Sequence, residues 1–304
     1  MTYLEVGAWS DHSHPSGSVV VGYNGKDHSR AALAWAAREA AQRGAPLLVL
    51  YAANYPGMAV EPGPGLLQRE PGALEAAEEV TARGVAEARD AHPALWVAGA
   101  TEVTSPSQAL TDASRDAALL VLGSRGYGRV AGALLGSVAF TVAARAASPV
   151  IVVKDEAVDR TVAPESPVVI GTDGSPAAAI ALDFAGGWAA RAGAPLTVVT
   201  CTGEHEGQRI DETQLRASAE RIAASAASRA RARHRGLTAT VKIEDGPPEL
   251  ALVDASARAG LIVVGTRGRG AYEGMLLGSV SHAVIHGARC AVAVVGGVAD
   301  PPAT

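Results

Sequence analysis

Two stretches of the chain place glycine and serine at a spacing that suits the binding of an anion. Each stretch reads Gly-x-x-Gly, nine further residues, then Gly-Ser. Glycine accepts positive φ and lets backbone N–H groups approach a ligand closely. Where such a loop enters a helix, the free N–H groups and the helix dipole favour phosphate, and the serine hydroxyl caps the helix or bonds a phosphate oxygen. The residues concerned are Gly123, Gly126, Gly136 and Ser137 in the first stretch and Gly265, Gly268, Gly278 and Ser279 in the second.

A glycine-rich turn before a capped helix that binds nothing explains either stretch taken alone, because short glycine motifs often match by chance. Two copies with matched spacing favour a phosphate site over this alternative. The pattern is not a Walker A loop, since the sequence has no Gly-Lys-Ser/Thr at this place, and it is not a GxGxxG turn after a first strand.

A second candidate element ends the first predicted strand of each copy. The second copy has Asp173 within Gly-Thr-Asp-Gly-Ser, and the first copy has Asn24 within Gly-Tyr-Asn-Gly. At the carboxyl edge of a sheet, Asp173 can accept hydrogen bonds from ribose or adenine or lie near a metal ion. Asp and Asn also serve as turn or N-cap residues before a helix, which is the alternative for both positions.

The sequence offers no matched set of nucleophile, base and acid in the two copies. His282 and His286 are four residues apart on a predicted helix, where the first copy has Phe140 and Ala144. We therefore interpret the histidines as a surface pair and predict no metal site. The two cysteines, Cys201 and Cys290, lie in apolar runs without a CxxC spacing, which predicts buried reduced thiols.

The elements that must position these residues also repeat. Residues 123–138 and 265–280 are identical at 10 of 16 positions. Short apolar runs alternate with helical patterns in both copies, which predicts parallel strands covered by helices on both faces. Strands are predicted at 18–23, 46–52, 94–100, 118–123 and 149–153, and again at 167–172, 195–201, 237–243, 260–265 and 290–295. Helices are predicted near 28–43, 72–91, 106–117 and from Ser137, and again near 176–192, 209–235, 248–259 and 279–288.

The resulting fold class is α/β, with two tandem doubly wound, Rossmann-like domains of five parallel strands each. The Pro/Gly-rich stretch 54–65 is predicted to be a loop of the first copy. We expect a flexible tail at 1–17, a first domain at 18–154, a polar linker at 155–166 and a second domain at 167–297.

Composition limits the function classes. The 304 residues are 48% hydrophobic and 19% charged, which is enough apolar material for two packed cores. The net charge of −5 argues against broad nucleic-acid binding, and positive charge is local, at Arg125, Arg129, Arg267 and Arg269. No apolar run approaches a membrane span and the amino terminus does not read as a signal peptide, so a soluble cytoplasmic protein without membrane partners is expected.

These features resemble the universal stress protein family in its tandem two-domain form. The glycine pattern is that family's ATP-binding signature, and IGTDGS (170–175) and LIVVGTRGRG (261–270) are similar to its other typical stretches. The resemblance implies ATP, together with Mg²⁺, in both halves. Asp173 matches the family aspartate, whereas Asn24 departs from it, so weaker binding by the first half is expected. The implied contacts are Gly123, Gly126, Gly136, Ser137 and Val138, Gly265, Gly268, Gly278, Ser279 and Val280, with the backbone of Ala52 and Cys201 at the adenine.

The resemblance also implies pairing through the last strands, Val150–Val153 and Ala291–Val295, either within the chain or in a homodimer. Three functions remain open on the sequence. The first is a non-catalytic, ATP-dependent stress regulator that acts on an unidentified protein partner. The second is a slow ATP hydrolase or phosphotransfer protein, and the third is an interaction scaffold that binds little nucleotide.

Overall fold

The computed structural model describes residues 15–52, 73–124, 136–203, 211–268 and 275–296. Most of the predicted tail, the predicted loop 54–65 and Gly126 lie outside these residues. Among the described residues, no helix is long and apolar enough to cross a membrane.

The first half alternates strands and helices in the predicted order. Its third strand begins three residues later than predicted, because Leu95 closes a turn on the carbonyl of His92 and the side chain of Trp96 is exposed. The elements are β1 (Val19–Gly22), α1 (Asp27–Arg43), β2 (Leu47–Ala52), α2 (Ala73–Ala91), β3 (Val97–Glu102), α3 (Pro106–Ala113), β4 (Leu119–Gly123), α4 (Ser137–Arg145) and β5 (Val150–Val153).

The second half repeats this order after a single turn of 3-10 helix, η1 (Asp155–Ala157). Its third helix ends at Ala255, four residues earlier than predicted, where Ser256 caps it and a turn follows. The elements are β6 (Val168–Gly171), α5 (Pro176–Ala192), β7 (Leu196–Cys201), α6 (Glu212–Arg233), β8 (Ala239–Glu244), α7 (Pro248–Ala255), β9 (Leu261–Gly265), α8 (Ser279–Gly287) and β10 (Ala291–Val295).

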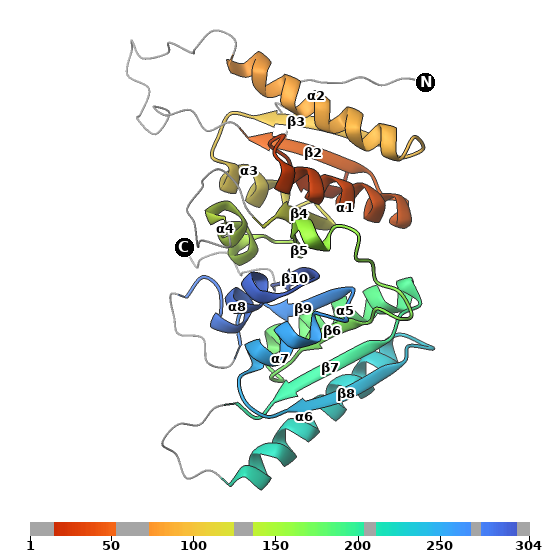
Figure 1. The fold of residues 1–304 in the computed structure, drawn as a ribbon, viewed down its shortest axis with the longest axis vertical. Helices are drawn as coiled ribbons and strands as arrows, with labels where there is room; N and C mark the ends of the chain where they lie inside the picture. The colour runs from red at the N-terminus through yellow and green to blue at the C-terminus, as the bar shows by residue number, and fades with distance from the viewer. Residues whose placement is uncertain (1–14, 53–72, 125–135, 204–210, 269–274, 297–304) are drawn as a thin grey trace.

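The two halves share one ten-stranded sheet, in the order β3-β2-β1-β4-β5-β10-β9-β6-β7-β8 (Figure 1). Within each half the strands are parallel, as predicted. The halves meet where β5 and β10 pair antiparallel, with Ile151 opposite Ala293. This confirms pairing of the last strands within the chain. Because β5 and β10 have a neighbour on both sides, a homodimer would have to use another surface.

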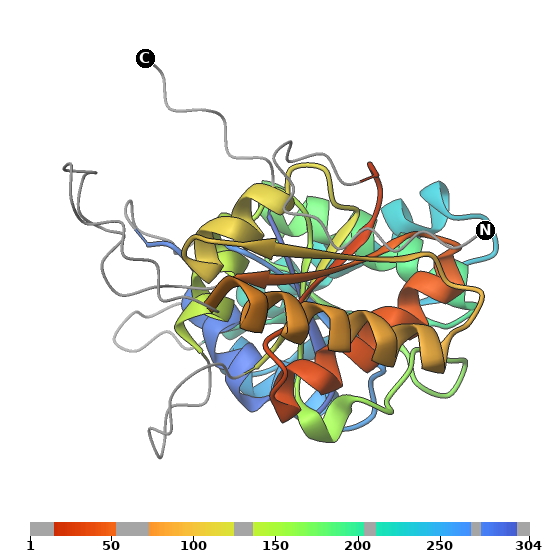
Figure 2. The same ribbon diagram turned by 90° about the horizontal axis from the view of Figure 1, so that it is seen from above.

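Helices cover both faces of the sheet (Figure 2). Helices α1, α2, α5 and α6 pack on one face, and α3, α4, α7 and α8 pack on the other. The strands are apolar on both faces, so neighbouring side chains enter opposite cores: Val19 and Val21 face the first helix layer and Val20 faces the second. This two-sided burial leaves the strand ends as the exposed edges where a ligand can bind.

The segment predicted as a linker packs against both halves. Arg38 of α1 donates a hydrogen bond to the carbonyl of Val158 at 2.5 Å. Arg160 donates to the carbonyl of Ala257, after α7, at 2.8 Å. Ala157, which directly precedes Val158, is fully buried. The joining segment is therefore a packed part of the interface between the halves.

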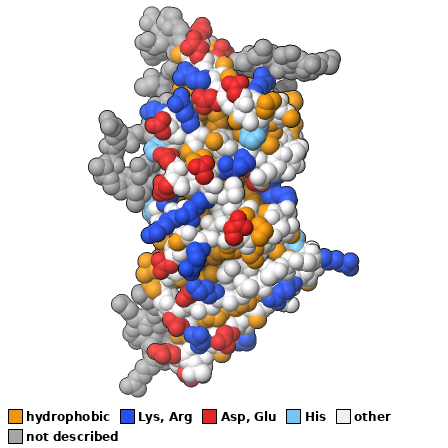
Figure 3. Space-filling model, turned by 45° about the vertical axis from the view of Figure 1, so that its right-hand side comes forward, with side chains coloured by type: hydrophobic (Ala, Val, Ile, Leu, Met, Phe, Trp, Pro, Cys, Tyr) orange, Lys and Arg blue, Asp and Glu red, His pale blue; other side chains and the backbone are white. Residues whose placement is uncertain are grey.

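The surface mixes charges of both signs. On the face shown in Figure 3, acidic and basic side chains are interspersed with apolar ones. This distribution fits the net charge of −5 and differs from the continuous basic surface that broad nucleic-acid binding needs.

Separating the halves should expose a sheet edge on each. We expect fragments cut in the joining segment to self-associate at micromolar concentration, because unpaired β5 and β10 edges template new strand pairing. Sedimentation velocity of each fragment checks this, with the intact chain as the control. Two monomeric, folded fragments would contradict the prediction.

Candidate functional site

A pocket of about 620 Å³ lies at the carboxyl edge of the second half. It is formed where β6, β7 and β9 end and α8 begins. Seven residues predicted from the sequence line it together, although they come from four separate parts of the chain: Asp173, Cys201, Gly265, Gly268, Gly278, Ser279 and Val280. The tertiary structure thus brings the second-half set to one cavity.

Close approach, and not positive φ, explains the glycines of this loop. Glycines with positive φ are found at eight described positions, and none of them is a motif glycine. A Cβ atom at Gly268 would lie 2.8 Å from Oδ2 of Asp173, so a side chain there would force the loop or the carboxylate to shift. At Gly265 and Gly278 a Cβ would stand 3.3 Å or more from the nearest protein atom, so these two glycines mainly leave room in the pocket itself.

Helix α8 begins beside the pocket with an open N-terminus. Its N-cap is Gly278, so Ser279 is the first helical residue and no side chain caps the helix. By contrast, Ser175 caps α5 by accepting from the N–H of Ala178 at 3.2 Å. Ser281 ties the first turn of α8 to the end of β9 by donating to the carbonyl of Gly265 at 2.6 Å. Of the two roles expected for Ser279, capping is not observed, and the first amides of α8 stay available to an anion.

Of the two roles that the sequence left open for Asp173, the structure shows the turn role, and the ligand-binding role stays a prediction. Its Oδ1 accepts a hydrogen bond from the N–H of Ser175 at 2.9 Å, which is the turn role. Its Oδ2 faces Gly268 of the glycine loop. In the first half, Oδ1 of Asn24 accepts from the N–H of Lys26 at 3.1 Å, so the single oxygen of the amide is used in the turn.

The pocket also contains residues that the sequence reasoning missed. Leu215, Ala219 and Ile222 of α6 line one wall, and Leu252 of α7 lines another. Their spacing on α6 marks an apolar helical face, which predicts burial but not a ligand. Arg267, noted only as local positive charge, also lines the pocket.

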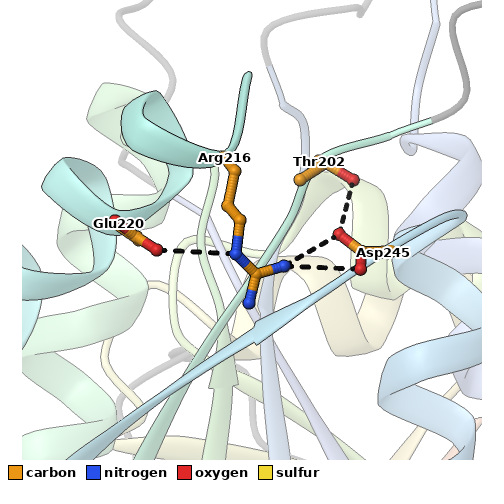
Figure 4. Close-up of polar contacts among 4 residues, drawn as sticks. All are labelled: Thr202, Arg216, Glu220 and Asp245. Atoms are coloured by element: carbon orange, nitrogen blue, oxygen red, sulfur yellow. Dashed lines mark hydrogen bonds and ion pairs between the residues drawn. The ribbon is translucent and has the colours of Figure 1, made fainter. Parts of the chain in front are cut away.

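A polar network fixes α6 beside this pocket (Figure 4). Arg216 binds both carboxylate oxygens of Asp245 at 3.3 and 3.4 Å, and its Nε lies 3.6 Å from Glu220. Thr202, which lines the pocket, donates to Asp245 at 3.4 Å. The network joins the start of α6 to the loop after β8 at the rim of the pocket.

The two cysteines are free thiols, but only Cys290 is buried. Cys201 is half-buried in the pocket wall, so the prediction that both are buried is wrong for this residue. Burial, and then the nearby carboxylate of Glu244, raise the pKa of Cys201 to about 11. At neutral pH the thiol is therefore protonated and serves as apolar lining.

We expect Cys201 to react slowly with iodoacetamide at pH 7.5. Because the thiolate is the nucleophile, the rate should rise about tenfold per pH unit and continue to rise above pH 10. Mass spectrometry of the native protein across pH 7–11 checks this, with Cys201→Ser as the control. A rate that levels off near pH 8.5 would show an unperturbed thiol.

The first-half residues lie at the equivalent edge. Asn24 follows β1, Ala52 ends β2 and Gly123 ends β4. Gly136 is the N-cap of α4, and its N–H donates to the carbonyl of Ser124 at 2.9 Å, as that of Gly278 does to Thr266 at 2.8 Å. Ser137 and Val138 open α4. The described part of the site therefore repeats in the first half, while the role of Gly126 stays a prediction.

The edge of the first half is more closely packed. A Cβ at Gly123 would lie 2.4 Å from the carbonyl oxygen of His28, whereas the nearest α5 atom to a Cβ at Gly265 is 3.5 Å away. The Nδ1 atom of His28 hydrogen-bonds Asp155 at 2.7 Å, a pair that the sequence reasoning missed because 127 residues separate the two.

His282 and His286 lie on α8 with their Nε2 atoms 3.1 Å apart. The ring of His282 packs edge-on against Phe140 of the first half. Among the described residues, no group of three or more His, Cys, Asp or Glu side chains is placed to hold a metal ion.

The fold and pocket define a tandem α/β protein with a ligand cavity at the carboxyl edge of its sheet. The family model described as the universal stress protein family matches residues 16–154 and again 166–296. The chain belongs to the universal stress protein family. It is 34% identical over 290 residues to universal stress protein Rv2005c of Mycobacterium tuberculosis, covering 91% of this chain and 96% of the relative.

Two further comparisons agree with this assignment. Universal stress protein Rv2623 of M. tuberculosis is 32% identical, over 91% of this chain and 95% of the relative. The crystal structure of a universal stress protein from Archaeoglobus fulgidus matches the fold with a TM-score of 0.64 at 22% identity, over 94% of this chain and all of that one.

Proposed function

We propose that the protein binds ATP in the pocket of its second half and acts as a nucleotide-dependent regulator in the stress response. The observation that carries the proposal is the convergence of seven predicted contact residues on one cavity of about 620 Å³. This volume falls within the range of small-molecule pockets.

One wall of the pocket is apolar and the opposite wall is polar, which suits the base and the phosphates of a nucleotide. The apolar side is formed by Leu215, Ile222 and Leu252, with the protonated thiol of Cys201, and accommodates the adenine ring. The opposite side has the glycine loop and the uncapped start of α8, whose N–H groups suit phosphate. Arg267 adds a positive charge to the lining.

The residues present also fit Mg²⁺ bound through the nucleotide. Mg²⁺ is commonly held by one or two carboxylates together with substrate phosphates and water. Asp173 is the single carboxylate among the described lining residues. The phosphates would therefore supply most of the ligands, and Asp173 would contribute directly or through water.

A binding role is favoured over catalysis by the titratable groups of the lining. Among the described lining residues these are Asp173, Cys201 and Arg267. The high pKa of Cys201 keeps its thiol from acting as a base, so Asp173 is the single candidate base among the described lining residues. Slow hydrolysis or phosphotransfer remains the alternative activity, and a scaffold that binds little nucleotide is the third.

The proposal includes a cytoplasmic location and a protein partner that responds to the occupancy of the pocket. The identity of the nucleotide that co-purifies with the full chain tests the function. After rapid desalting and acid extraction, chromatography should detect intact ATP. ADP in its place would favour the hydrolase, and a protein without nucleotide that also fails to bind added ATP would favour the scaffold.

A further inference from the structure

A second cavity, of about 340 Å³, lies between the two halves and shares no lining residue with the ATP pocket. This seam cavity has walls from the second part of α1, from the second part of α5 and from the segment 155–166 that joins the halves. Gly260, which directly precedes β9, places the cavity near the amino ends of the strands. The charged lining residues are Arg38, Glu39, Arg160 and Arg191, and the rings of Trp35 and Trp188 also line the cavity.

Positive charge exceeds negative charge in this seam cavity. Three arginines and one glutamate line it, which gives a net charge of +2. Glu39 is a largely buried carboxylate whose Oε1 lies 3.0 Å from Arg191 of the other half. The same oxygen also accepts from Arg43, behind the cavity, at 2.5 Å. One carboxylate therefore serves two guanidinium groups.

The other two arginines of the cavity lack a carboxylate partner among the described residues. Arg38 donates to the carbonyl of Val158, and Arg160 donates to the carbonyls of Ser256 and Ala257. Carbonyl oxygens hold the guanidinium groups in place without neutralising them. Each group has further N–H donors, since a guanidinium carries five.

The environment of Arg191 shows that its charge is incompletely balanced. Burial lowers the pKa of its guanidinium, Arg43 lowers it further, and Glu39 offsets only part of this. The guanidinium groups of Arg191 and Arg43 lie 5.0 and 4.6 Å from the ring centroid of Trp188. Because the indole restrains both groups, an incoming anion would meet donors that are already ordered.

We propose that the seam cavity binds the phosphate group of a small anionic ligand, with Arg38, Arg160 and Arg191 as its contacts. The planar forks of guanidinium groups match phosphate oxygens, and such charge-assisted hydrogen bonds are the strong ones. The cavity has little more than half the volume of the ATP pocket, which fits inorganic phosphate or a small phosphate ester. Since both halves and the joining segment line it, bound ligand stabilises their present arrangement.

Tryptophan fluorescence and calorimetry of the full chain test the proposal. Trp35 and Trp188 are buried with ring centroids 5.9 Å apart, so their emission should respond to a ligand in the cavity. The probes are inorganic phosphate and glycerol 3-phosphate, titrated at constant ionic strength against chloride. The titrations are run on the parent and on the double variant Gly126→Val/Gly268→Val, so that phosphate in the two nucleotide sites is recognised separately and failure of ATP binding leaves this test intact.

Two charge variants at the cavity identify the site. Gln42→Glu adds a carboxylate to the lining at an exposed position and removes no existing contact, so it should fold normally. Arg160→Gln removes one of the three proposed guanidinium contacts to the phosphate group. Each should weaken phosphate binding by roughly tenfold, the loss expected for one charge-assisted hydrogen bond. Matched controls are Gln214→Glu, at an exposed position on α6, and Arg229→Gln, whose guanidinium pairs with Asp183 outside the cavity.

Saturable binding of either probe that Gln42→Glu weakens and Gln214→Glu does not would establish the site. Tighter binding of glycerol 3-phosphate would identify an ester as the ligand class, and equal binding would identify the inorganic ion. A response no different from chloride, or binding that neither cavity variant changes, would overturn the proposal.

Discussion

We expect Gly268→Val to abolish the proposed ATP binding in the second half and to leave binding in the first half unchanged. A Cβ at residue 268 would lie 2.8 Å from Oδ2 of Asp173. Either the loop or the carboxylate must then move, and the branched side chain also occupies the region that the phosphates would approach. Because Gly268 is exposed and its φ is not positive, the fold itself should tolerate the change.

Isothermal calorimetry of the nucleotide-free protein measures this as a loss of one binding site per chain. Gly187→Ala is the control. A Cβ at residue 187 would lie 3.6 Å from His234, which is an ordinary contact distance, and this glycine is far from the motif in the sequence. Gly126→Val should remove the other site, and the double variant should bind no ATP. If Gly268→Val binds as much ATP as the parent, the assignment of the loop is wrong.

We expect the first half to bind ATP more weakly than the second, and Asp173→Asn to make the second half resemble the first. Asp173 has two acceptor oxygens, one used by the N–H of Ser175 and one facing the glycine loop. The only acceptor atom of Asn24 receives the N–H of Lys26. The remaining NH₂ group of the amide can only donate, so it cannot accept from a ribose hydroxyl or from adenine.

The expected size of this effect follows from the bond that is lost. A charge-assisted hydrogen bond contributes roughly 1.5–3 kcal/mol. This corresponds to about tenfold to a hundredfold in affinity. A carboxylate also repels the anionic phosphates, but at the ribose end that repulsion is distant and screened, so the lost bond should dominate.

Site-specific affinities are accessible because Gly126→Val and Gly268→Val each isolate one half. In these backgrounds Asn24→Asp should strengthen the first site, and Asp173→Asn should weaken the second. Asp183→Asn is the matched control, because it makes the same chemical change on α5, where the side chain pairs with Arg229 and Arg233. Equal affinities that neither swap alters would show that residues 24 and 173 are turn residues only.

The close packing of the first half also favours unequal sites. Tyr23, at the end of β1, is buried, and its ring would touch a Cβ at Gly84 at 2.8 Å. The residue at the same place in the second half is the smaller Thr172, which lines the pocket. This difference adds to the effect of Asn24 and has the same direction.

Local patterns were sufficient to predict most of the architecture. Continuous apolar runs such as 119–122 and 261–264, alternating with helical patterns, predicted strands buried on both faces, and the repeat predicted that both halves share one strand order. The glycine spacing also located one side of the pocket, since the ends of parallel strands meet at one edge. These signals succeed because each depends on residues close together in the chain.

Contacts between distant residues were decided only by the tertiary structure. Glu39 of α1 accepts a hydrogen bond from Arg191, 152 residues away in the chain, and both side chains line the seam cavity. The close approach at Gly268 comes from Asp173, 95 positions earlier, and not from a positive φ of its own. The apolar wall of the pocket depends likewise on how α6 packs over β7. Burial and close approach are properties of packed pairs, and a single sequence gives the residue types of such pairs without saying which residues meet.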